Sequence, residues 1–212
     1  MTHLRAWRKV TALPALTLAS ALVLSTLAAP AQAGNTRSTD AEDAALAFSA
    51  GNYTPLTITI DGVSTTVRWY KEVCYVAKPV QAAATQSSMM GGTTTISNTQ
   101  CGYQSMNIFV PEASASNQST AMYLAVNNGG WVSSYIKASV ADGGSYSSST
   151  SNAAAALKAG YVYIDVASRG RGLVGADGSY IGKAPAAIVD VKAAIRYLRL
   201  NDNVMPGSAE RI

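Results

Sequence analysis

The stretch AMYLAVNNGGW, residues 121–131, is the part of the sequence that decides the expected fold. Residues 121–126 are apolar and typical of a buried β-strand, and two glycines follow almost at once. Glycine allows a positive φ and lets backbone amides approach a ligand closely. We therefore expect Gly129 and Gly130 to form a loop at the end of a strand, with Trp131 beside it.

A strand and helix pattern continues on the C-terminal side of this loop. A Ser- and Gly-rich connection leads to a helix expected at 153–158, which Gly160 ends. Residues 161–166 are almost continuously apolar, as in a strand covered on both faces. Pro185 then begins a second helix, in which four apolar residues recur at the spacing of a buried stripe, namely Ile188, Val191, Ile195 and Leu198.

The N-terminal side has the pattern of antiparallel strands. Apolar residues alternate with polar ones at 56–60 and again at 65–69, and Asp61-Gly62 between them is typical of a type I′ hairpin turn. Further strands are expected at 73–78, ended by Pro79, and at 104–110, ended by Pro111. Antiparallel strands followed by β-α-β-α predict one α/β domain, a mixed sheet with helices on its faces.

The first 33 residues have the features of a secretory signal peptide. Arg5, Arg8 and Lys9 precede the apolar stretch 13–29, and Ala-Gln-Ala at 31–33 is an A-x-A cleavage site. We expect cleavage after Ala33 and a secreted protein, extracellular or periplasmic; the alternative is an uncleaved signal anchor. The remaining residues, 34–212, are expected to form a single domain that begins with a short helix within 34–50 and contains a low-complexity loop insertion at 81–102.

The charge of the exported part excludes some functions. Without the leader, 13 Lys and Arg face 12 Asp and Glu, a net charge of +1. A domain with so small a net charge has no excess of positive charge with which to attract nucleic acid or anionic lipid. We therefore expect no nucleic-acid partner, and no stable membrane association once the signal is cleaved.

The two cysteines, Cys74 and Cys101, flank the low-complexity stretch. In an oxidising compartment such a pair favours a disulfide, which would restrict the loop between them. The alternative is one buried and one exposed thiol. A catalytic cysteine is not expected, because His3, the only histidine, lies in the predicted leader.

Several residues invite a chemical interpretation. Backbone amides of Gly129 and Gly130 could stabilise the negative charge that develops on an ester carbonyl oxygen, although a tight turn explains two glycines equally well. Asp190 and Lys192 are expected to be solvated or salt-bridged helix residues. Arg169 and Arg171 should hold the following loop by hydrogen bonds to carbonyls or a carboxylate. Asp165, inside an apolar strand, is expected to be an ion-pair partner, because burial alone would raise its pKa.

Five segments together resemble the bacterial tannase branch of the α/β-hydrolases, with its feruloyl esterase and carboxylesterase relatives. These segments are 75–80, 103–111, 127–131, 168–171 and 183–199. The resemblance implies an α/β-hydrolase-type mixed sheet and an acyl-enzyme mechanism without metal or cofactor. It also implies that Gly130 supplies one oxyanion amide, with Gly129 and Trp131 shaping the loop. Trp131 would either line the acyl pocket or pack against the core and so hold the loop to it.

The sequence departs from that family in one respect. No G-x-S-x-G motif occurs, so the nucleophilic serine is absent, and so are the acid and histidine of its triad. We therefore expect the N-terminal part of a secreted serine esterase, truncated before the nucleophile elbow and inactive as given. The implied substrates of the complete protein are small aromatic or acyl esters. The alternative is a non-catalytic exported α/β binding module.

Overall fold

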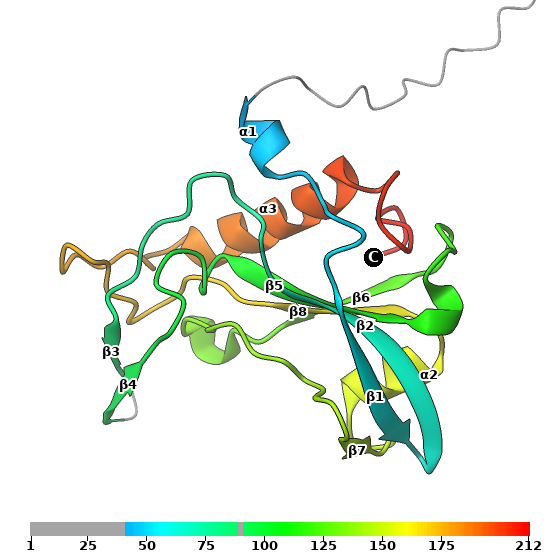
Figure 1. The fold of residues 1–212 in the computed structure, drawn as a ribbon. Helices are drawn as coiled ribbons and strands as arrows, with labels where there is room; N and C mark the ends of the chain where they lie inside the picture. The colour runs from blue at the N-terminus through cyan, green and yellow to red at the C-terminus, as the bar shows by residue number, and fades with distance from the viewer. Residues whose placement is uncertain (1–40, 89–90) are drawn as a thin grey trace, which may run out of the picture. The chain divides into compact units, whose positions relative to one another are not determined.

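The computed structural model describes residues 41–88 and 91–212 (Figure 1). The predicted signal peptide and its cleavage site lie outside the described residues. A membrane span would need a long apolar helix, and the described part of the chain contains none.

A six-stranded mixed sheet with the strand order β6-β8-β5-β2-β1-β7 forms the centre of the domain. The pairs β1–β2, β2–β5 and β5–β8 are antiparallel, whereas β6–β8 and β1–β7 are parallel. The strands are β1 (Thr54–Ile60), β2 (Val63–Cys74), β5 (Ser105–Pro111), β6 (Met122–Val126), β7 (Ser145–Tyr146) and β8 (Val162–Val166). This sheet and its helices confirm the predicted α/β class.

The hairpin of β1 and β2 has the predicted turn. Ile60 pairs with Val63, so Asp61 and Gly62 alone connect the strands, with φ of 48° and 81°. Two positive φ values in a two-residue loop are the signature of a type I′ turn.

The predicted strand at 73–78 is wrong in its bounds. Strand β2 continues through Val73 and ends at Cys74, and its register against β5 shifts between Tyr70 and Val73. The Asn107 Oδ1 atom accepts hydrogen bonds from Trp69 Nε1 at 2.9 Å and from the Glu72 amide at 2.8 Å, and thereby supports this irregularity. The alternation of apolar and polar residues could not show that these residues form one long strand with a bulge, and not two separate strands.

Helices α2 (Asn152–Lys158) and α3 (Ala186–Leu200) cover opposite faces of the sheet (Figure 1). Side chains alternate along β5: Met106, Ile108 and Val110 pack in the cluster that contains Leu198 of α3. Phe109 points the other way, into the cluster of α2. Because successive side chains of a strand point to opposite faces of the sheet, the core has two layers, one on each face. The short elements α1 (Ala41–Ala45) and η1 (Glu112–Ser114) lie outside these layers.

Strand β6 is an edge strand, which corrects the prediction of a buried strand at 121–126. Strand β8 lies between β6 and β5, so within residues 41–88 and 91–212 strand β6 has a neighbouring strand on one side only. Tyr123 is 40% exposed and Val126 44%. An apolar sequence alone cannot distinguish an edge strand from a central one.

The buried stripe predicted for α3 is wrong at its start. Ile188 is 57% exposed, and Val191 and Ile195 are half-buried, whereas Leu198 is fully buried as expected. The buried face instead consists of Ala187, Asp190, Ala194, Tyr197 and Leu198. An apolar strip of this helix therefore remains open.

The stretch 81–102 is more structured than the predicted loop insertion. Strands β3 (Thr85–Ser87) and β4 (Thr93–Thr95) pair as a small antiparallel ribbon. Gln86, which is buried, anchors the ribbon, because its amide group exchanges hydrogen bonds with the backbone of Val174. The predicted disulfide between Cys74 and Cys101 is present at the end of this stretch.

Removal of the disulfide should lower the free energy of unfolding. The bridge spans a sequence separation of 27 residues, and closing a loop of that size stabilises a protein by about 3 kcal/mol. We expect a loss of this size on replacing Cys74 and Cys101 by serine, measured by urea unfolding against the oxidised protein. Equal midpoints and slopes for the two proteins would contradict a stabilising bridge.

Candidate active site

The loop after β6 has the backbone conformation that its glycines permit. Gly129–Trp131 form the 3₁₀ turn η2, in which Gly130 has φ 63°. Trp131 has φ 61°, a conformation that is uncommon for a residue other than glycine. The chain therefore makes two successive left-handed steps at the end of the strand.

Two amides of this loop have no hydrogen-bond acceptor among the described residues. The amide of Trp131 donates to the Asn128 carbonyl at 3.0 Å, and that of Val132 to the Gly129 carbonyl at 3.3 Å. No such bond is present for the amides of Gly129 and Gly130. Because a backbone N–H retains its full capacity to donate, the loop can stabilise an anionic oxygen.

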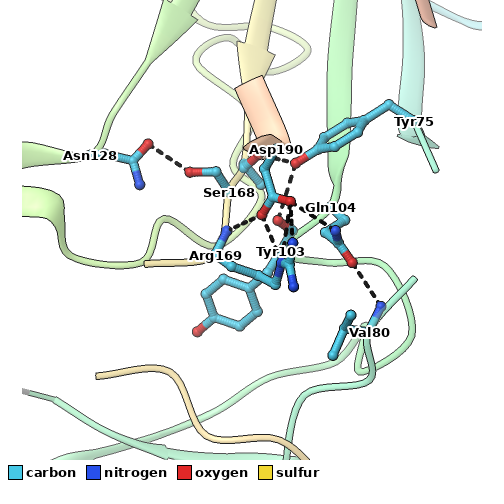
Figure 2. A network of polar contacts seen from close by, with 9 residues as sticks. Tyr75, Val80, Tyr103, Gln104, Asn128, Ser168, Arg169 and Asp190 are labelled. Carbon is cyan, nitrogen blue, oxygen red and sulfur yellow. Dashed lines mark hydrogen bonds and ion pairs between the residues drawn. The ribbon is translucent and has the colours of Figure 1, made fainter. Parts of the chain in front are cut away.

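The segment that follows β8 holds this loop in place. The Arg171 amide donates to the Trp131 carbonyl at 2.7 Å, and Ser134 and Ser168 exchange two backbone hydrogen bonds of 2.9 and 3.0 Å. The Ser168 hydroxyl also donates to the Asn128 Oδ1 atom at 2.7 Å (Figure 2). Ser168 is therefore a loop anchor that the sequence did not reveal.

Two glycines allow the backbones around the loop to come into contact. A Cβ atom built on Gly182 would lie 1.7 Å from the Gly170 carbonyl oxygen, and one on Gly170 would lie 2.6 Å from the Ser133 amide nitrogen. Only hydrogen fits in these places. The sequence shows both glycines but gives no sign of this crossing, because it joins segments that are distant along the chain.

A buried ion pair fixes the segment after β8 to helix α3. Arg169 donates to the carboxylate of Asp190 from its amide at 2.8 Å, from Nε at 2.9 Å and from a terminal nitrogen at 2.7 Å (Figure 2). Asp190 is only 1% exposed. Its carboxylate raises the pKa of the Arg169 guanidinium above the ordinary value through these hydrogen bonds. Of the alternatives for Asp190, the salt bridge is confirmed and the solvated residue is wrong.

Further polar groups complete this network. Gln104 Nε2 donates to Asp190 at 2.9 Å, and Gln104 Oε1 accepts from the Val80 amide at 2.7 Å. The Tyr75 hydroxyl donates to the Ala167 carbonyl at 2.8 Å, and burial raises the pKa of this phenol. The network therefore joins the segment after β2, the residue that precedes β5 and the segment after β8 to α3 (Figure 2).

Asp165 is buried without the ion pair that was predicted. Its carboxylate accepts hydrogen bonds from the Ser139 amide at 2.7 Å and from the Ser139 hydroxyl at 2.8 Å. Burial raises its pKa, and the bonds from Ser139 oppose that shift. Asp165 lies on the α2 side of the sheet and, within the part of the chain that the structure describes, forms no hydrogen bond or ion pair with the loop after β6, so it belongs to the core.

Trp131 does not pack against the core to hold the loop to it, because this residue is 62% exposed. It instead borders three hollows. One of about 540 Å³ is lined by the loop itself, including Gly129. A groove of about 710 Å³ runs along Val126 and the open strip of α3, Ile188, Val191 and Ile195. A third, of about 370 Å³, lies towards Arg171 and Lys183.

The described residues contain no histidine, which leaves Ser168, Ser133 and Ser134 without an imidazole base. Within the same ranges we find no cluster of three or more His, Cys, Asp or Glu side chains that could bind a metal ion.

Comparisons with solved structures identify proteins that are similar to this chain. Fusobacterium nucleatum tannase is 30% identical with a TM-score of 0.58, and the match covers 79% of this chain and 32% of that one. Tannin acyl hydrolase from Lactobacillus plantarum is 29% identical with a TM-score of 0.57, over 79% and 33%. A tannin acyl hydrolase in complex with ethyl gallate is 29% identical with a TM-score of 0.59, over 79% and 34%.

The chain is similar to the bacterial tannases. The resemblance predicted from the five sequence segments is thereby confirmed. The tannase-like chain spans about one third of the length of the tannases that it matches. No protein-family model matches it, and no curated protein matches it closely enough to report.

Replacement of Gly182 by alanine should destabilise the protein and displace the loop. A methyl group there would clash with the Gly170 carbonyl, and a clash of this kind in packed backbone costs about 1–3 kcal/mol or more. We expect a lower urea midpoint for Gly182→Ala. Gly51→Ala is the matched control, since nothing lies within 4 Å of a Cβ at that site. Equal midpoints for the two variants would contradict the close crossing.

Neutralisation of Asp190 should be much more costly than neutralisation of an exposed carboxylate. Asp190→Asn leaves the partly buried Arg169 guanidinium without its counter-charge, a loss of about 3 kcal/mol, at the low end of the range for buried pairs. Glu210→Gln is the control, because the Arg199–Glu210 pair is exposed and 3.9 Å long, and such pairs contribute about 0–1 kcal/mol. Denaturant unfolding measures both, and a similar small loss in the two variants would contradict a buried ion pair.

Proposed function

We propose that this chain is the part of a secreted serine ester hydrolase that carries the oxyanion loop. In this proposal the Gly130 amide donates to the carbonyl oxygen of a bound ester as that oxygen becomes negative. Gly129 and Trp131 shape the loop around it. A serine nucleophile, with its histidine and acid, would belong to polypeptide beyond the given sequence.

The unpaired amide of Gly130 is the observation that carries this proposal. Gly129 and Gly130 both leave their amides without an acceptor among the described residues, so these N–H groups can donate to a ligand, and Gly129 lines the hollow of about 540 Å³ at the loop. The loop is also held rigidly, by Asn128–Ser168 and by its pairing with the segment after β8. Fixed donors stabilise a developing charge better than mobile ones, because they need no reorganisation.

The edge of β6 supports the placing of the nucleophile next to this loop. Strand β6 has a free edge, and the open strip of α3 lies beside it across the groove of about 710 Å³. The Met122 amide, at the start of β6, donates to the Arg211 carbonyl at 2.9 Å, so the chain at residue 211 runs along this edge. A strand that continued there would pair with β6 and end near the glycine loop, as a strand before a nucleophile elbow must.

The proposed substrates are small aromatic esters. The similar tannin acyl hydrolases include complexes with ethyl gallate and with 3,4-dihydroxybenzoate, and Trp131 offers an exposed indole beside the loop. We also propose secretion. It rests on the signal-like sequence of residues 1–33 and on the disulfide, which suits an oxidising compartment.

Ester hydrolysis tests this proposal. We expect the 212-residue chain to give no turnover of ethyl gallate above buffer, and the product of the complete open reading frame to hydrolyse it. In the complete protein, Gly130→Ala keeps the N–H but strains a backbone that has φ 63°, so the donor should be displaced and kcat should fall by about tenfold or more, since loss of one oxyanion donor costs up to 10²–10³. Gly51→Ala is the control and should be neutral.

Two results would contradict the proposal. Turnover by the 212-residue chain that a serine-directed fluorophosphonate blocks would show that the chain has its own nucleophile. A reading frame that stops at codon 212 in a secreted, folded and inactive product would instead favour the binding module.

A further inference from the structure

The hollow of about 370 Å³ beside Trp131 combines apolar and cationic side chains. Its apolar lining consists of Ala184, Pro185, Ala187 and Ile188. Arg171 and Lys183 also line it, and no carboxylate is among the lining residues. We call this hollow the Arg171 pocket.

Both cations of the Arg171 pocket lack an acidic partner. Among the described residues, neither Arg171 nor Lys183 forms a salt bridge or a side-chain hydrogen bond. Arg169 is only two residues away from Arg171, yet Asp190 binds it fully. Arg171 is fixed through its backbone, which pairs with Trp131 and Ser133. Its exposed guanidinium is therefore available to a ligand, and the backbone that carries it is held in place.

Two further features add to the positive character and define the ligand's shape. The pocket lies at the first turn of α3, a helix of 15 residues whose Ala187 amide has no acceptor among the described residues. The N-terminus of a helix favours negative charge. Trp131 lines the same pocket and is largely exposed, so its indole can stack on a planar group.

We propose that the Arg171 pocket binds an aromatic carboxylate, with the ring against Trp131 and the carboxylate between Arg171 and Lys183. This inference depends on the proposed function only for where the ligand comes from, and not for the binding itself. Trp131 borders both this pocket and the hollow at the glycine loop. An ester bound at Gly130 can therefore place an acidic aromatic group of its leaving part in the Arg171 pocket. The free acid released by hydrolysis is the other source of the same chemistry.

Isothermal titration of the 212-residue chain with 3,4-dihydroxybenzoate tests the proposal. The neutral comparison ligand is 3,4-dihydroxybenzamide, which keeps the ring and loses the charge. We expect the carboxylate to bind at least about fivefold more tightly than the amide, since one charge-assisted hydrogen bond in a partly exposed site supplies that much. Equal affinities for the two ligands would overturn the proposal.

Substitutions test whether the ligand binds in the Arg171 pocket. Arg171→Gln and Lys183→Gln should each remove most of the preference for the carboxylate, and Trp131→Phe should weaken both ligands. Lys137→Gln, at an exposed lysine that does not line the pocket, is the matched control. Neither pocket cation has a side-chain contact to lose, so melting temperatures should stay equal. Preference retained in both glutamine variants would overturn the proposal.

The source of the ligand is distinguished in the complete protein. Two esters are compared, one with a free carboxylate on its aromatic leaving part and one in which that carboxylate is a methyl ester. Faster hydrolysis of the first indicates that the pocket binds the substrate. Inhibition by the free acid, without a difference between the two esters, indicates that the pocket binds the product. Titration needs no nucleophile, so failure of the esterase assay leaves this test intact, and absence of carboxylate binding leaves the esterase proposal intact.

Discussion

The hydrogen-bonded ion pair between Arg169 and Asp190 is the constraint on which the rest of the site depends. It joins the segment after β8 to helix α3, and that segment in turn pairs with the residues that follow the glycine loop. The Asp190 carboxylate is fully buried and Arg169 is partly buried, so displacement of either would leave a charge in the interior without its partner. This pair therefore helps to fix the segment that holds the glycine loop.

The five sequence segments that carry the tannase resemblance meet around this pair. Tyr75, Gln104, Asn128, Ser168 and Asp190 come from five separate stretches of the chain and lie in one view (Figure 2). Most of them touch neither the proposed oxyanion amides nor the Arg171 pocket. They instead hold the backbone around these sites in place, so the segments that carry the resemblance act together as one polar network.

Local features of the fold could be predicted from sequence, and long-range ones could not. The Asp61-Gly62 turn, β5, β8 and the start of α3 at Pro185 follow from turn chemistry and periodicity, which act over a few residues. The exposed Ile188 and the edge position of β6 depend on which strand lies next to which, and a single sequence does not encode that visibly. The Gly170–Gly182 crossing and the burial of Asp190 were missed for the same reason. The glycine loop after β6 could be predicted from its place after an apolar strand, whereas the residues that anchor it could not.

Amide hydrogen exchange, resolved by residue, tests most directly whether the loop is rigid and its donors are unpaired. The Gly129 and Gly130 amides should exchange at nearly the rate of an unstructured chain, while those of Ser134, Ser168 and Arg171, which are hydrogen-bonded within the protein, should be strongly protected. Protection of Gly130 would mean that its N–H is bonded inside the protein. Exchange at Arg171 as fast as at Gly130 would mean that the loop is not held. Either result would contradict an anchored loop with free amides.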